Sequence, residues 1–225
     1  PQNKTRSYSL NRLAINLGWA FGGALGGFLA AVNYHLLFWV DGCTNIAAAL
    51  LLLKLLPRSG FTGAKQKNAA HHLHASAYAD KVYLIFIALA VLFATCFFQL
   101  FTIQPFFYKT EWHLNERFIG ILMAMNGILI AVFEMVIIHN LEGKRHPLRY
   151  IGIGVTITGI AFLLLNILPA VSYTALLVTL LITLGEMMSM PFMNAFWIVR
   201  TSGHNQGQYA ALYSMAWSTA QILAP

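Results

Sequence analysis

Six long apolar stretches limit this chain more than any other feature of its sequence. A helix rises about 1.5 Å per residue and the hydrocarbon core of a bilayer is roughly 30 Å thick, so about 20 apolar residues are needed to cross it. Buried strands are much shorter, and strands of membrane barrels alternate apolar and polar residues. The sequence therefore predicts an all-α integral membrane protein. The expected spans are Leu13–Val32, Leu36–Leu56, Val82–Tyr108, Phe118–His139, Leu148–Leu168 and Tyr173–Val199, and a seventh begins near Gln208 and continues to Pro225.

The composition excludes two other classes of protein. Hydrophobic residues make up 58% of the 225 residues and charged residues only 9%, against about 25% charged residues in ordinary soluble domains. A disordered chain needs low hydrophobicity, and a small soluble domain needs more surface charge. The two cysteines, Cys43 and Cys96, lie in apolar runs with neither a disulfide framework nor metal-ligand spacing. We expect no metal and no cofactor.

The basic residues predict the orientation in the membrane. If the segment with Lys4, Arg6 and Arg12 faces the cytoplasm and the spans alternate, twelve of the fourteen Lys and Arg residues fall on the cytoplasmic side. Only Lys109 and Arg117 then lie outside, as the positive-inside bias requires. The net charge of +7 thus indicates topology and weak binding to anionic lipid head groups. We expect no nucleic-acid partner.

The first span and the last one carry a weak internal repeat. Both follow a polar stretch, and their small and apolar residues match at a constant offset. A repeat at this distance fits two halves of six helices each, with the first span as helix five and the last as helix eleven. The matched residues are Leu10, Ala14, Gly18, Gly22 and Gly23 with Leu212, Ala216, Ala220, Ala224 and Pro225.

At these residues the sequence resembles the major facilitator superfamily. The segment Asn16–Gly27 is similar to the family's glycine-rich helix-five motif, which is associated mainly with antiporters. Gly22-Gly23 stands where that motif usually has Gly-Pro, and Ala224-Pro225 resembles its second-half counterpart. The resemblance covers the whole chain, as a fragment with helices five to eleven of twelve. It is strongest to bacterial multidrug-type members.

The loops extend the resemblance. The turn with Glu142, Lys144 and Arg145 lies where the family has a second copy of its acidic-basic loop motif. The resemblance implies a helical bundle of two pseudo-symmetric six-helix halves, the first incomplete here, in a monomeric multi-pass protein of the inner cell membrane. The implied divisions are 1–56 as helices five and six, 57–81 as a cytoplasmic linker and 82–225 as helices seven to eleven.

Glycines recur every fourth residue in the first span. Gly18, Gly22 and Gly26 follow this step, and so do Gly23 and Gly27. Small residues on one face let two helix backbones approach closely in lipid. Plain helix packing is the leading interpretation. The alternative is a tight, slightly bendable contact that seals the outer mouth between the two halves.

Three acidic residues lie inside expected spans, where an ionisable side chain is costly and marks a functional site by default. Glu186, near the middle of the sixth span, is interpreted as a protonatable group, against a purely structural acid bonded to a neighbouring helix. Glu134 lies in the cytoplasmic third of the fourth span. A role in proton release or substrate contact and a structural role as a hydrated acid explain this position equally well. For Asp41, near the outer end of the second span, an interfacial position is favoured over proton coupling.

Neutral polar residues in the spans are candidates for a substrate lining. Gln99 and Gln104 lie among phenylalanines in the third span, Asn126 is near mid-depth in the fourth, and Asn194 follows Glu186 by eight residues in the sixth. Amide and aromatic groups together suit amphipathic organic molecules. For most of the phenylalanines, contact with lipid is the simpler explanation.

These features favour a secondary transporter that moves a small organic solute by alternating access. The resemblance to antiporters makes proton-coupled efflux the first hypothesis, with Glu186 and Glu134 as the coupling acids. Proton-coupled uptake of a sugar or organic acid is the alternative within transport. A non-transporting polytopic membrane protein is the alternative outside it. The sequence has no cluster of catalytic residues near one interface, so we do not expect an enzyme.

Overall fold

The computed structural model describes residues 2–55, 76–201 and 205–224, and the regular structure within them is helical. A short 3₁₀ helix, Ala77–Ala79, precedes the second group of helices. The α-helices are α1 (Gln2–Val32), α2 (Tyr34–Leu55), α3 (Lys81–Phe98), α4 (Ile103–Thr110), α5 (Glu116–Leu141), α6 (Pro147–Ile167), α7 (Ser172–Arg200) and α8 (Gln206–Leu223).

Six helical segments in the described part are long and apolar enough to cross a membrane. They coincide with the six complete spans expected from the sequence, which confirms the all-α membrane architecture. Helix α8 covers the start of the seventh apolar stretch. The segments are Leu13–Val32, Tyr34–Leu55, Lys81–Thr110, Glu116–Leu141, Pro147–Ile167 and Ser172–Arg200.

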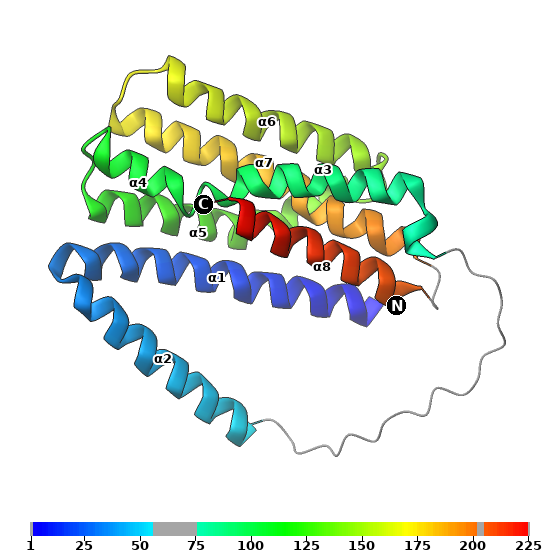
Figure 1. The fold of residues 1–225 in the computed structure, drawn as a ribbon, viewed down its shortest axis with the longest axis horizontal. Helices are drawn as coiled ribbons and strands as arrows, with labels where there is room; N and C mark the ends of the chain where they lie inside the picture. Colours follow the sequence, from blue (N-terminus) through cyan, green and yellow to red (C-terminus); the bar gives the residue numbers. More distant parts are fainter. Residues whose placement is uncertain (1, 56–75, 202–204, 225) are drawn as a thin grey trace.

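Helices α3 and α5 to α8 form one bundle, and α1 lies along its side against α5 (Figure 1). Helix α2 diverges from the bundle (Figure 1), and none of its residues is buried. At one end of the bundle, which we call the basic end, α5 and α7 finish and α3, α6 and α8 begin. Lys81, Arg145, Arg149 and Arg200 lie there.

The third expected span is interrupted. We expected one span from Val82 to Tyr108, but the structure ends α3 at Phe98 and restarts as α4 at Ile103. Pro105 has no backbone N–H, so it cannot donate to the carbonyl of the preceding turn. The end of α3 tightens first, since the N–H groups of Leu100 and Phe101 bond carbonyls three residues back at 3.0 Å. A wider turn follows, in which the Gln104 N–H bonds the Gln99 carbonyl at 2.8 Å, five residues back.

Glycines bring α6 and α7 into direct backbone contact. A Cβ placed on Gly154 would lie 2.5 Å from the Gly185 carbonyl oxygen and 2.8 Å from the Ser189 nitrogen. On the other side of the contact, a Cβ on Gly185 would collide with the Thr158 hydroxyl. Small residues allow helices to pack this closely without a hydrophobic driving force between them. The contact holds α7 along the bundle.

Only part of the glycine pattern in α1 makes a close contact. A Cβ on Gly27 would lie 2.7 Å from Gly120 Cα of α5, and one on Gly23 would lie 2.7 Å from Met123 Cβ. These two positions form the α1–α5 contact. A Cβ on Gly18, Gly22 or Gly26 would meet no atom of the described structure within 4 Å.

A polar cluster joins three helices at the basic end. Asp80 caps α3, since its side chain accepts from the Tyr83 N–H at 3.1 Å. It also accepts from Arg200 at the end of α7, through Nε at 2.6 Å and Nη2 at 2.9 Å, and from the Tyr209 hydroxyl of α8 at 3.0 Å. The Arg200 guanidinium is the main reason that the pKa of Asp80 is lowered from 3.8 to about 2.

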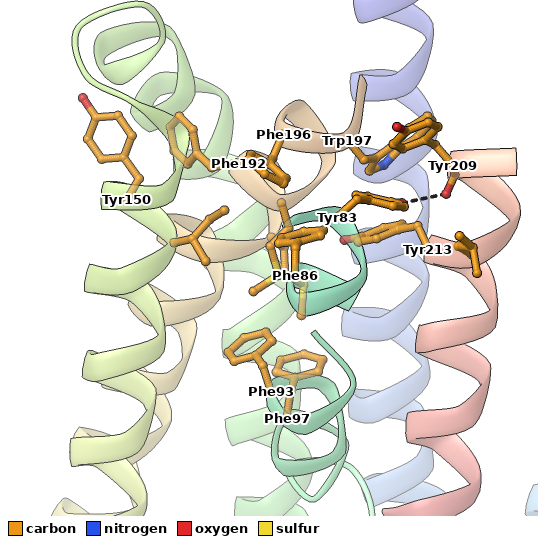
Figure 2. Packing of buried hydrophobic residues seen from close by; sticks show 14 of the residues in the cluster. Tyr83, Phe86, Phe93, Phe97, Tyr150, Phe192, Phe196, Trp197, Tyr209 and Tyr213 are labelled. Atoms are coloured by element: carbon orange, nitrogen blue, oxygen red, sulfur yellow. Dashed lines mark hydrogen bonds between the residues drawn. The ribbon is translucent and has the colours of Figure 1, made fainter. Parts of the chain in front are cut away.

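Aromatic side chains fill the bundle next to this cluster (Figure 2). The Tyr83 hydroxyl donates to the Tyr209 carbonyl at 2.7 Å, and the two rings lie 4.4 Å apart. Phe86 of α3 packs against Phe196 of α7, with ring centroids 4.6 Å apart. The polar cluster and the aromatic core therefore hold the basic ends of α3, α7 and α8 as one unit.

We predict that Gly154→Ala destabilises the protein while Gly152→Ala does not. The new methyl group on Gly154 has no space between α6 and α7, so the free energy of unfolding should fall by about 1–3 kcal/mol. Gly152 lies on the same helix with open space around it, so alanine there should raise helix stability by about 0.5–1 kcal/mol. Unfolding in detergent, followed by circular dichroism, measures both, and equal effects would contradict the contact.

We predict that Asp80→Asn destabilises the protein in a pH-dependent way. Loss of a hydrogen-bonded charge pair should cost about 1–3 kcal/mol at pH 7. Because the folded pKa of Asp80 lies below 3.8, this stabilisation is present above that pH and is lost as the pH falls from 3.8 toward about 2. The difference between wild type and variant should therefore shrink below pH 3 in the same unfolding measurement. Asp41→Asn, at an exposed position of α2, is the control, and a pH-independent gap for Asp80→Asn would refute the ion-pair explanation.

Candidate functional site

A cavity of about 1080 Å³ lies inside the helix bundle. It reaches from Glu186, at mid-depth of α7, to Arg200 and His146 at the basic end. Helices α3, α5, α7 and α8 provide most of its wall, and Ile15 of α1 contributes from the side. A cavity of this size that is lined mainly by apolar side chains and a few polar ones is typical of a small-molecule site.

Two buried acids line the cavity from different helices. Glu134 projects from α5 and Glu186 from α7, and only 4% and 5% of their surfaces are exposed. The sequence placed both inside spans, and the structure brings them into one cavity. An acid at such a position is expensive in hydrocarbon, so a polar cavity is where it is best accommodated.

Asn126 connects the two helices that carry these acids. Its amide Nδ2 lies 3.3 Å from Glu186 Oε2 and 3.0 Å from Thr183 Oγ1, both on α7. Asn126 is 2% exposed and lines the cavity with Glu186. The predicted polar lining and the predicted protonatable group are therefore in direct contact here. Sequence spacing within one helix could not show this, because the two residues are 60 positions apart.

Asn194, just over two turns beyond Glu186 on α7, also lines the cavity. Its Oδ1 accepts from the Trp197 indole at 3.3 Å. The remaining candidates are elsewhere. Gln104 is buried and donates to the Tyr108 hydroxyl at 2.6 Å, and neither it nor Gln99 is among the lining residues. Asp41 lies in the exposed helix α2, and Pro225 is outside the described residues.

Aromatic rings form another part of the wall. Phe97 and Phe98 at the end of α3 contact Trp217 of α8 edge to face, with centroids 6.3 and 5.7 Å apart. Phe192 and Phe196 of α7 line the cavity as well. The sequence draws attention to the phenylalanines of the third span, but not to Trp217 or to the phenylalanines of α7. These residues lie in apolar helices, where the sequence does not distinguish a side chain that lines a cavity from one that faces lipid or the protein core.

Charged residues gather at the cavity's opening on the basic end. Glu142, Arg145 and His146, from the turn between α5 and α6, line the opening together with Arg200. Lys144 of the same turn is exposed and is not among the lining residues. The turn reverses at Gly143, whose φ of 76° is a left-handed conformation that glycine adopts without strain.

The described residues include no group of three His, Cys, Asp or Glu side chains that could hold a metal ion. The histidines His71, His72 and His74 lie outside the described residues.

Over residues 1–225 the sequence matches the family described as Major Facilitator Superfamily. No curated protein and no solved structure matches the chain. The family match covers all the helices described above, and it agrees with the six membrane-crossing segments and the central cavity. The chain belongs to the major facilitator superfamily and is a multi-pass membrane transporter for a small molecule.

Proposed function

We propose that this transporter couples the efflux of an amphipathic organic molecule to the entry of protons. The observation that carries the proposal is that two buried acids, Glu134 and Glu186, line one cavity from facing helices. A carboxyl group in such a place binds and releases protons in response to its surroundings. A substrate that enters the same cavity changes those surroundings directly.

Alternating access is supported by the two ends of the bundle. The cavity reaches the basic end, where Arg145 and Arg200 line it. At the opposite end, Gly27 of α1 meets the start of α5, since a Cβ there would lie 2.9 Å from the Glu116 carbonyl oxygen. With the basic end in the cytoplasm, this arrangement corresponds to an inward-facing state in which the α1–α5 contact closes the outer side.

The lining supports an amphipathic substrate. Aromatic rings from α3, α7 and α8 provide apolar surface, and Asn126 and Asn194 provide amide groups. Efflux is favoured over uptake because the glycine-rich segment of α1 resembles the antiporter motif. We place the protein in the inner cell membrane as a monomer, with its basic end in the cytoplasm.

We predict that Glu186→Gln abolishes proton-driven transport. The substitution keeps the size of the side chain but removes the titratable proton, so proton-driven flux should fall to the level of vesicles without the protein. The measurement is ethidium accumulation in inside-out vesicles, with the complete protein, under an imposed pH gradient. Right-side-out vesicles with glucose and succinate test the uptake alternative.

Glu111→Gln is the matched control, because Glu111 is an exposed acid outside the cavity. It should transport like the wild type. Equal coupled flux in wild type and Glu186→Gln would refute the assignment of Glu186. Transport of every probe without any dependence on the pH gradient would refute proton coupling itself.

A further inference from the structure

Helix α5 contacts two different partners with two different faces. Asn126 faces α7, where it bonds Glu186 and Thr183. Gly120 and Met123 face α1, where they form the α1–α5 contact. Asn126 follows Gly120 by six residues, which is about 240° around a helix, so the two lie on different sides of α5. One rigid element therefore touches both the buried acid and the outer contact.

The orientation of the Asn126 amide is determined by its partners. Thr183 donates its only hydroxyl hydrogen to the Thr179 carbonyl at 2.7 Å, so its oxygen is left to accept from Asn126. An amide NH₂ group has two hydrogens. One lies toward Thr183 Oγ1 at 3.0 Å and the other toward Glu186 Oε2 at 3.3 Å. Asn126 is thus held as a donor to the carboxyl group.

A donor in this position responds to the proton on Glu186. A hydrogen bond to a carboxylate is about twice as strong as one to a neutral acid. When Glu186 takes up a proton, the link from α5 to α7 at this depth weakens. The bond to Thr183 does not change with pH, so of the two amide hydrogen bonds only the one to Glu186 responds to protonation.

The other ionisable groups near Glu186 lie farther along the cavity toward the basic end. Glu134 projects from α5, Glu142, Arg145 and His146 follow it in the turn, and Arg200 lies at the end of α7, bonded to Asp80. The lining residues from α1, α3, α6 and α8 include no charged side chain. Asn126 is a neutral group that bonds Glu186 from α5.

We propose, resting on the proposed role of Glu186, that Asn126 is a positioning residue that passes the protonation state of Glu186 through α5 to the α1–α5 contact. Protonation weakens the bond between α5 and α7 at mid-depth, and α5 then tilts against α1 at the Gly27–Gly120 crossing. This tilt of α5 opens the outer side of the bundle. Coupling of this kind needs an element with two arrangements that both sites bias, and α5 is that element.

The test compares Asn126→Leu with Thr183→Val in the complete protein in proteoliposomes. Leucine removes both amide bonds at similar size, whereas valine removes only the Thr183 partner and leaves the bond to Glu186. In Asn126→Leu the pH at half-maximal ethidium transport should move upward by about one unit, since the lost donor stabilised the carboxylate. Thr183→Val should shift the midpoint much less than Asn126→Leu, because the amide can still donate to the Glu186 carboxylate.

A second readout follows α5 itself. Spin labels at the exposed positions Val32 of α1 and Ile128 of α5 report their separation by pulsed electron resonance, after Cys43 and Cys96, both exposed, are replaced by serine. The wild-type distance should change between pH 5 and pH 8. In Asn126→Leu this change should become smaller, and its midpoint should move upward together with that of transport.

The outcomes separate this proposal from the proposed function. A wild-type midpoint and a wild-type distance change in Asn126→Leu would overturn the role of Asn126, while Glu186→Gln tests Glu186 independently. Equal midpoint shifts in Asn126→Leu and Thr183→Val would show a structural role only and would also overturn it. If Asn126→Leu does not fold, Asn126→Asp replaces the donor by an acceptor at the same size, and an unchanged midpoint there has the same meaning.

Discussion

The cost of a polar group in hydrocarbon governs this structure. Every backbone N–H and C=O in a span must bond within the protein, which leaves helices as the form of each spanning segment. The same cost applies to side chains, so Asn126, Thr183 and Glu186 bond one another across two helices. Where no ordinary helical bond is available, as before Pro105, the chain closes tighter and wider turns instead. The few polar side chains of the cavity gather where these requirements meet.

Helix α5 has a central position for the same reason. On one side it carries Gly120, and the absence of a side chain there allows α1 to approach its backbone. On the other side it carries Asn126, whose amide is too costly to leave without partners in this setting. Close packing and polar bonding thus act on two different faces of one rod. A transporter that changes shape needs such an element, because packed interfaces switch between discrete arrangements and do not deform continuously.

The predictions from the sequence succeeded where a property belongs to one helix. Span lengths follow from runs of apolar residues, and the depth of Glu134 and Glu186 follows from their place in those runs. Gln99 and Gln104 were expected with Asn126 on the same basis, but the turn before Pro105 redirects the chain, and Gln104 bonds Tyr108. The Asp80–Arg200 pair joins residues 120 positions apart, and no local pattern marks it. Trp217 and Phe192 lie in apolar helices, and only the packing of those helices determines which of their sides faces the cavity.

The sequence by itself determined that this chain is helical, that it crosses a membrane and which of its acids lie at depth, since hydrocarbon thickness and the cost of charge act on each segment separately. The tertiary structure decided which glycines meet a partner, which amides face the cavity and which acid bonds Asn126. Those outcomes depend on the rotation of each helix about its axis and on its neighbours. Both are set by close packing between segments distant in the chain, which a pattern read along one helix does not contain.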